Sequence, residues 1–181
     1  MFDNLEFRLY QETESDKLEI FLTTENWPFH GSENPTMEKV KKWISDGDFT
    51  GEDNRTFWIY LMNNPVPIGI VFLHELTDYT PIFDLRVLSK VRNKGIGKKV
   101  LKWLTRYVFT ETDKHRIEGH TRVDNIPMQK VFKSCGWVKE AYYRQAWPDS
   151  NKQFYDAVTY AILKSDWETG KITTIDWSDC L

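Results

Sequence analysis

Hydrophobic and polar positions change their spacing several times along the chain, and these changes divide it into short strands and helices. Apolar alternation predicts strands over 5–11, 55–62, 68–76, 81–88, 116–123, 137–147 and 153–163. Apolar spacings of three and four predict helices over 15–25, 36–47 and 125–136, and one from the loop after residue 88 to about Thr112. Ser15 and Thr36 are the expected caps of the first two helices. The tail 165–181 is expected to be irregular, with its two tryptophans as candidates for docking on the body.

The predicted order of elements is βααβββαβαββ, and it indicates one α/β (α+β) domain over residues 1–181. Helices that alternate with strands in the middle, flanked by hairpins, predict a mixed central sheet of about seven strands with helices on both faces. The strand–helix–strand unit over 81–123 predicts a right-handed crossover. A chain of 181 residues is long enough for one sizeable core.

Charge and cysteine content narrow the possible classes of function. The 24 basic and 27 acidic side chains give a net charge of -3, which argues against a nucleic-acid partner and makes a local basic cluster a local anion site. Cys135 and Cys180 are too few for a disulfide framework. The N-terminus lacks the pattern of a signal peptide, and no apolar run reaches transmembrane length. We expect a cytoplasmic monomer or homodimer with no membrane partner and no metal.

One stretch, VLSKVRNKGIGKKVLKWL over 87–104, carries a concentrated positive charge. It contains six basic residues and no acidic one, and Gly95 and Gly97 open its helix. Free N–H groups and the positive end of the helix dipole bind anions at such a helix start, and phosphate is the natural ligand. The stretch lacks the third glycine of a dinucleotide fingerprint and the first glycine of a P-loop, which weakens a nucleotide-binding alternative.

The pattern Arg-x-x-Gly-x-Gly over 92–97, between a strand and a helix, resembles the acetyl-CoA pyrophosphate loop of the GNAT N-acetyltransferase superfamily. The segments RVDNIPMQKVFKSCGWVKEAYYR and FYDAVTYAIL resemble the subgroup of ribosomal-protein N-terminal acetyltransferases. The resemblance implies a GNAT fold with acetyl-CoA as co-substrate. It assigns strand-end contacts with pantetheine to Val87 and Leu88. It assigns the pyrophosphate cradle to Arg92, Asn93, Lys94, Gly95, Ile96, Gly97 and Lys98. Asn125 would contact pantetheine, orient the neighbouring strand, or simply cap the next helix.

The resemblance also implies direct attack by an amine, which must first lose a proton. His120 is the first candidate for the base, because the similar alanine-specific ribosomal enzymes carry a glutamate at its position; the alternative is a hydrogen-bonded core histidine. Glu118 is the second candidate, and Asp84, Glu75 and His74 are further options.

The leaving thiolate raises a second question, since Phe132 stands where many members of the superfamily carry a proton-donating tyrosine. Tyr143, Tyr142 or Ser134 would replace it, or the thiolate leaves unaided. Cys135 is either the site of a covalent acetyl-enzyme or a small buried residue.

The acceptor amine is predicted only as a class. Trp27, Phe29 and His30 lie in the loop 26–35, where they form either an acceptor wall or part of the core. Arg86 would pair with Asp84 or Glu118, or meet an acidic acceptor. Seven carboxylates either form an acidic opening to the site that attracts a cationic acceptor, or lie on a solvated surface. They are Glu25, Glu33, Glu38, Asp46, Asp48, Glu52 and Asp53.

The sequence therefore predicts an acetyl-CoA-dependent N-acetyltransferase that acts on an amine-bearing acceptor, either a protein N-terminus or a small molecule such as a polyamine or aminoglycoside. The alternative is a non-catalytic module that binds or senses acyl-CoA, and Phe132 is its best support.

Overall fold

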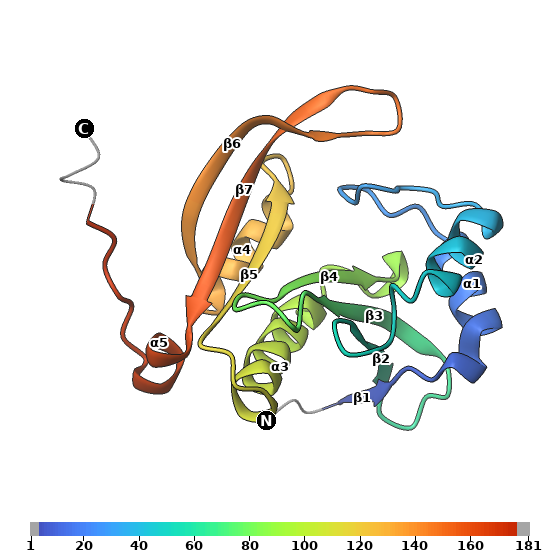
Figure 1. The fold of residues 1–181 in the computed structure, drawn as a ribbon, viewed down its shortest axis with the longest axis horizontal. Coiled ribbons are helices and arrows are strands. Elements are labelled where there is room, and N and C mark those ends of the chain that lie inside the picture. The colour runs from blue at the N-terminus through green and yellow to red at the C-terminus, as the bar shows by residue number, and fades with distance from the viewer. Residues whose placement is uncertain (1–3, 177–181) are drawn as a thin grey trace.

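The computed structural model of the protein describes residues 4–176, and its centre is a seven-stranded mixed sheet (Figure 1). The strands run β1-β2-β3-β4-β5-β7-β6 across the sheet, and β4 and β5 are parallel while the other neighbours are antiparallel. Their bounds are β1 (Leu5–Leu9), β2 (Arg55–Leu61), β3 (Pro67–His74), β4 (Ile82–Val87), β5 (Arg116–Arg122), β6 (Val138–Pro148) and β7 (Phe154–Leu163). The predicted strands and mixed sheet are confirmed.

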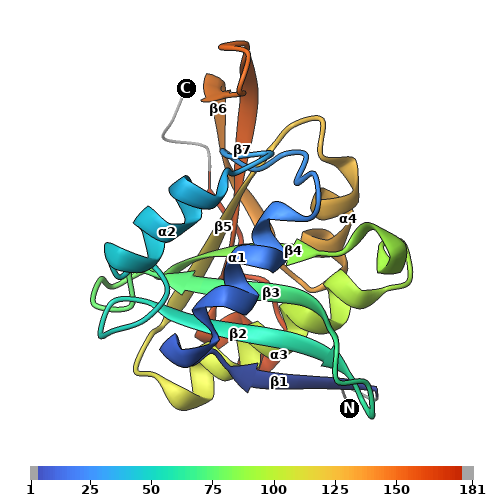
Figure 2. The ribbon, with the colours of Figure 1, turned by 90° about the vertical axis from the view of Figure 1, so that its right-hand side faces the viewer.

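The helices cover both faces of the sheet, as predicted. They are α1 (Ser15–Thr23), α2 (Met37–Ser45), α3 (Ile96–Glu111), α4 (Ile126–Ser134) and α5 (Lys164–Thr169), with 3-10 turns at Glu12–Glu14 and Ser89–Val91. Figure 2 shows α1 and α2 in front of β2 and β3, with α3 behind the sheet. Aromatic side chains fill both layers: Trp58 packs edge-on against Phe21 of α1, and Phe57 packs against Trp103 of α3.

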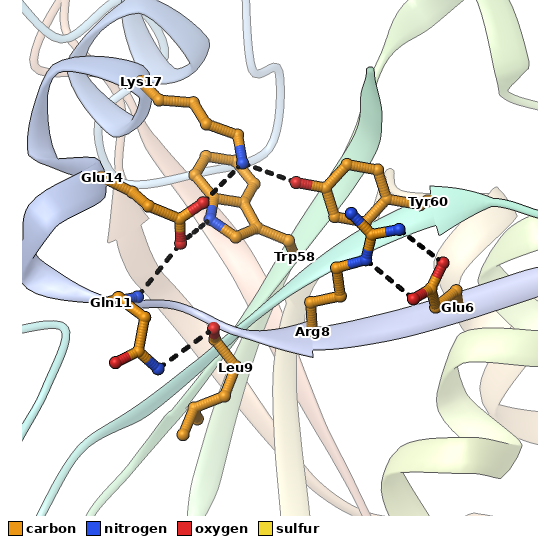
Figure 3. Close-up of polar contacts among 8 residues, drawn as sticks. All are labelled: Glu6, Arg8, Leu9, Gln11, Glu14, Lys17, Trp58 and Tyr60. Atoms are coloured by element: carbon orange, nitrogen blue, oxygen red, sulfur yellow. Dashed lines mark hydrogen bonds and ion pairs between the residues drawn. The ribbon is translucent and has the colours of Figure 1, made fainter. Parts of the chain in front are cut away.

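A polar cluster fastens the start of α1 to the sheet (Figure 3). The Glu14 carboxylate accepts hydrogen bonds from Trp58 Nε1 at 3.0 Å and from the backbone N–H of Gln11 at 3.1 Å. Lys17 forms an ion pair with the same carboxylate at 2.7 Å. The prediction that Ser15 caps α1 was wrong, because the 3-10 turn carries the chain into the helix and Ser15 is its first residue. This anchor holds the segment that leads to the loop after α1.

The prediction of an irregular tail was wrong at its start, where Lys164–Thr169 form α5. The helix ends at Gly170, whose φ of 68° is left-handed and costs glycine little. The buried Asp166 carboxylate accepts hydrogen bonds from the N–H and the hydroxyl of Thr173, and Trp167 packs against Phe109 with ring centroids 5.7 Å apart. The second tryptophan of the tail lies outside the described residues, as does Cys180.

β4 and β5 diverge, and this divergence positions the site. Their register contains one pair, Ile82 with Glu118, whereas β4 is paired with β3 along its whole length. Beyond that pair the facing edges of the two strands no longer hydrogen-bond to each other. On the side of α3 and α4, Gly119 makes room for the ring of Phe132, because a Cβ at residue 119 would lie 2.8 Å from Phe132 Cζ. Because the pairing of β4 with β5 ends at Ile82 and Glu118, the sheet opens in its middle.

Candidate active site

The basic turn after β4 forms an anion cradle at the start of α3. Gly95 adopts a left-handed conformation with φ of 76°, which turns the chain sharply into the helix. Helical hydrogen bonding begins when the Lys99 N–H donates to Gly95 O at 3.2 Å, so the amides of Ile96, Gly97 and Lys98 precede the first bond. Three consecutive amides at the positive end of a 16-residue helix suit a phosphate group.

A first cavity of about 440 Å³ opens directly against this cradle, between the turn, α4 and the loop after α1. All of the residues predicted for CoA binding line it, except Leu88 and Lys94. Leu88 is buried, its N–H donates to Ile68 O, and its carbonyl accepts from the Val91 N–H. Its backbone is therefore already paired, and the structure does not bring it to the cavity.

Arg92 clamps the turn rather than pointing freely into the cradle. Its Nε donates to Val87 O at 2.8 Å, and its Nη2 lies 3.6 Å from a carboxylate oxygen of Glu25. The Glu25 carboxylate in turn accepts from the Ser89 N–H at 2.9 Å. Arg92 thus ties the end of β4 to the chain after α1, and the Val87 carbonyl that sequence analysis offered to pantetheine is engaged by it. Val87 still lines the cavity.

Asn125 fulfils two of its predicted roles. Its Oδ1 accepts from the Met128 N–H at 3.3 Å, which caps α4, and its Nδ2 donates to Thr121 Oγ1 on β5 at 2.9 Å. Asn125 thereby fixes the start of α4 against the diverging strand. It also lines both the first cavity and its neighbour.

A second cavity of about 370 Å³ lies in the opening between β4 and β5. It adjoins the first cavity, since the two share the lining residues Phe29, His30, Leu85, Asn125 and Met128. Histidines from three places in the chain line it: His30 from the loop after α1, His74 from β3 and His120 from β5. A molecule in this cavity would meet a second molecule in the first cavity at the shared residues.

The protein engages the nitrogen atoms of these histidines to different degrees. His120 Nδ1 lies 2.8 Å from Thr159 Oγ1 and its Nε2 lies 3.3 Å from Glu118 Oε1, so both nitrogens have partners. His74 Nδ1 lies 2.8 Å from Asn54 Oδ1, and burial lowers the pKa of this imidazole despite nearby carboxylates. His30 Nδ1 lies 2.9 Å from Asp84 Oδ1.

Of the partners predicted for Arg86, which were Asp84, Glu118 or an acidic acceptor, the structure shows Asp84. The Asp84 carboxylate lies 2.9 Å from Arg86 Nη2. Burial alone would raise the pKa of Asp84, but the charge of Arg86 and the contact with His30 more than offset it and hold the pKa far below its ordinary value. Arg86 is itself buried, and its Nη1 has no hydrogen-bond partner among residues 4–176. Asp84 is therefore an ionised acceptor at neutral pH.

Among residues 4–176, no tyrosine lines either of the two adjoining cavities. Phe132 lines the second cavity and stacks on Tyr160 with centroids 4.8 Å apart. Tyr143 and Tyr142 are exposed on the edge strand β6, and Tyr142 hydrogen-bonds to Asp156. None of the three predicted replacements lines either cavity, Ser134 included. Glu118 is not part of the lining but holds His120, and Arg116 binds it at 2.7 Å.

Cys135 is a half-buried free thiol whose Sγ lies 3.7 Å from Lys98 O. Burial raises the pKa of this thiol, which disfavours the reactive thiolate. The observed packing agrees with the prediction of a small buried residue.

The seven carboxylates predicted to form an acidic opening do not gather at one place. Glu33 lies 3.7 Å from Arg122, Asp46 pairs with Lys42, and Asp53 accepts hydrogen bonds from Thr77. Asp48 lines a third cavity of about 400 Å³, which shares His74, Ile82 and Asp84 with the second cavity. Glu75 lines this third cavity as well, and neither carboxylate forms an ion pair within the described chain. The prediction that these seven carboxylates form one acidic opening was therefore wrong, although Asp48 and Glu75 give the third cavity a negative charge.

Sequence reasoning missed several lining residues. Met128, Lys130 and Val131 line the first cavity from α4, and their helical spacing beside Asn125 was the signal that pointed to one shared face. Trp147 lines the second cavity from β6, and nothing local marks it as a site residue.

Comparisons with known proteins agree with this geometry. The model of a family described as "Acetyltransferase (GNAT) family" matches residues 10–137. An uncharacterized N-acetyltransferase of Bacillus subtilis (strain 168), YnaD, is 28% identical over 141 residues, which cover 71% of this chain and 82% of that protein.

Solved structures match over almost the whole chain. A spermidine N-acetyltransferase from Vibrio cholerae, in complex with CoA and spermine, superposes with a TM-score of 0.78 at 19% identity and covers 91% of this chain and 98% of its own. A GNAT-family acetyltransferase from Bacillus anthracis superposes with a TM-score of 0.74 at 21% identity, covering 90% and 96%. At these identities the structures establish the fold. Over residues 4–176, no helix has both the length and the apolar character that crossing a membrane requires.

Proposed function

The chain belongs to the acetyltransferase (GNAT) family and is an N-acetyltransferase, and from that membership we propose that it transfers the acetyl group of acetyl-CoA to the primary amine of a small cationic acceptor. The observation that carries this proposal is the pair of adjoining cavities, one against an anion cradle and one lined by three histidines.

The first cavity would hold CoA. The amides of Ile96, Gly97 and Lys98 would bind the pyrophosphate, and Gly97 allows a close approach because it has no side chain. Lys98 and Lys130 line the same cavity and add positive charge. Pantetheine would follow Val87 and Leu85 into the opening between β4 and β5, toward Asn125, which both cavities share.

The second cavity would hold the acceptor. The loop after α1 and Trp147 of β6 add walls to the opening between β4 and β5, so the cavity encloses a small molecule more readily than a folded protein surface. The third cavity continues it past His74, where Asp48 and Glu75 supply negative charge and Trp43 supplies an aromatic face. These features favour an elongated amine with a second positive charge. Aliphatic polyamines are the first class to test, and the spermine complex of the Vibrio cholerae enzyme supports that choice.

A protein N-terminus is the alternative acceptor, given the resemblance to ribosomal-protein N-terminal acetyltransferases. We propose to measure thiol release from acetyl-CoA with spermidine, spermine, an aminoglycoside, and peptides that begin with different residues. We expect the polyamines to react with the highest kcat/KM and with rates that fall as salt rises. Faster reaction with peptides would move the assignment to protein N-termini. If the protein binds CoA but releases no thiol from acetyl-CoA with any of these amines, it would instead be the non-catalytic acyl-CoA-binding module.

A further inference from the structure

We infer that His30, held by Asp84, is the group that takes the proton from the acceptor amine and returns it to the leaving sulfur. This inference rests on the proposed function. It differs from the expectation from sequence, in which His120 was the first candidate and His30 was part of a wall.

The position of His30 is the first argument. Among the three histidines of the second cavity, only His30 also lines the first cavity. An amine in the second cavity must reach a thioester that extends from the first, and the two can meet only where the cavities adjoin. A base at this junction can reach both the attacking nitrogen and the leaving sulfur.

The free nitrogen atom is the second argument. Asp84 Oδ1 is buried and has no hydrogen-bond partner by geometry among residues 4–176, and His30 Nδ1 lies 2.9 Å from it as an ion-pair contact. An ionised carboxylate accepts only, so a proton on His30 Nδ1 would satisfy this buried oxygen, and Nε2 of the neutral ring would then keep its lone pair. No hydrogen bond to His30 Nε2 is found within residues 4–176. In His120 both ring nitrogens have protein partners, so it has no nitrogen free for an amine.

The rigidity of the loop is the third argument. Trp27 is fully buried, its Nε1 donates to Leu22 O at 2.8 Å, and its backbone N–H donates to Glu33 O at 2.8 Å. The His30 N–H donates to Trp27 O, and Phe29 holds a left-handed φ of 72°, which is uncommon outside glycine. Strained backbone of this kind persists where the surroundings impose it, often at functional sites. The loop thus presents His30 in one orientation.

Arg86 completes the arrangement by holding Asp84. Arg86 orients the carboxylate, the carboxylate orients His30, and His30 faces the junction. This is the order of roles found in triads built from a base and the group that orients it. The charged and titratable groups around His30 are Asp84 and Arg86 on β4, His74 on β3, His120 and Arg122 on β5, Glu33 in its own loop, Arg92 in the turn, Lys98 on α3 and Lys130 on α4.

The reaction balances with one histidine in both roles. Nε2 takes a proton from the acceptor ammonium, and the neutral nitrogen then attacks the thioester carbon. The new nitrogen–carbon bond replaces the carbon–sulfur bond, whose electron pair leaves with sulfur. His30 gives its proton to that sulfur, and the extra proton on the amide nitrogen goes to water. Phe132 has no proton to give, and this sequence does not require one from it.

The test compares His30→Asn with the matched control His120→Asn, using the amine that the wild-type enzyme acetylates best. The Asn side chain keeps a donor near Asp84 but cannot take a proton. We expect kcat to fall about 100- to 10,000-fold for His30→Asn and less than about tenfold for His120→Asn, with melting curves checking that both variants remain folded. His30→Ala and Asp84→Asn extend the series.

The pH profile separates proton transfer from a structural role. Without a base, the amine must lose its proton in solution, so kcat/KM of His30→Asn should keep rising with pH after the wild type has levelled off. If His30→Asn keeps kcat within a few-fold, or if its profile runs parallel to that of the wild type, the inference is overturned. A larger loss for His120→Asn would return the role to His120. Absence of acetyl transfer by the wild type would be a failure of the proposed function, which the same assay registers separately.

Discussion

Gly97→Ala should make the protein more stable and its CoA binding weaker. Gly97 is the second residue of α3, and an added Cβ would meet only Val131 Cγ2, at 3.5 Å, which is ordinary van der Waals contact. Because the fold has room, the change acts through helix propensity, where alanine is favoured over glycine by up to about 1 kcal/mol. For a chain of this size, that corresponds to a rise of about 2–4 °C in melting temperature.

The same methyl group would stand in the first cavity, which Gly97 and Val131 both line. It would keep a phosphate oxygen from approaching the amides at the start of α3. A hydrogen bond to a charged group contributes about 1.5–3 kcal/mol, so losing one should raise the Kd for CoA about 10- to 100-fold. Melting curves without ligand and calorimetric titration with CoA measure the two effects independently.

Gly31→Ala is the matched control. Nothing lies within 4 Å of a Cβ at residue 31, and Gly31 lines the second cavity but not the first. We expect the Kd for CoA to be unchanged in this variant. A Gly97→Ala protein that is stabilised yet binds CoA as tightly as the wild type would refute the cradle. A lower melting temperature for Gly97→Ala would refute the account of its packing.

Three further outcomes follow from the packing and charges of the same region. Gly119→Ala should destabilise the fold by about 1–3 kcal/mol in urea titrations, because its Cβ would lie 2.8 Å from Phe132 Cζ in a rigid aromatic cluster; an unchanged midpoint would contradict this. Burial lowers the pKa of His74 in the folded protein. Between that lowered pKa and the ordinary value of about 6.5, the unfolded state therefore binds more protons than the folded state. The free energy of unfolding should fall as the pH drops below about 6.5. His74→Gln should reduce this fall, and an identical pH dependence in both proteins would reject it. Cys135→Ala should keep kcat and a sequential kinetic pattern, because burial raises the pKa of the thiol; loss of acetyl transfer in a folded variant would point to an acetyl-cysteine.

The secondary structure and the anion cradle were accessible to sequence reasoning because both depend on neighbours in the chain. The strands of the sheet appear as apolar alternation, and Asn125 caps α4 as its position before Ile126 predicts. In the turn after β4, glycine spacing and basic residues act on a helix that begins at Ile96. The sequence did not predict α5, because a helix of six residues is too short for a clear periodic pattern. Its stability comes from tertiary contacts such as that of Trp167 with Phe109.

The assignment of the base shows where sequence reasoning ended. His120 and His30 are equivalent as residue types, and the family resemblance alone favoured His120. The difference between them is that Thr159 and Glu118 occupy both nitrogens of His120, while Asp84 contacts only Nδ1 of His30.

The sequence by itself determined the order of strands and helices, the family resemblance and the turn that would bind phosphate. Only the tertiary structure decided which residues meet at the opening between β4 and β5, which carboxylates are already paired, and which histidine has a free nitrogen. The physical reason is that helix, strand and turn preferences arise from local backbone and periodicity, whereas the availability of a polar atom depends on partners brought from distant strands and loops. His30 and Asp84 are brought together by the way the loop after α1 packs over β4, and that packing is a property of the whole fold.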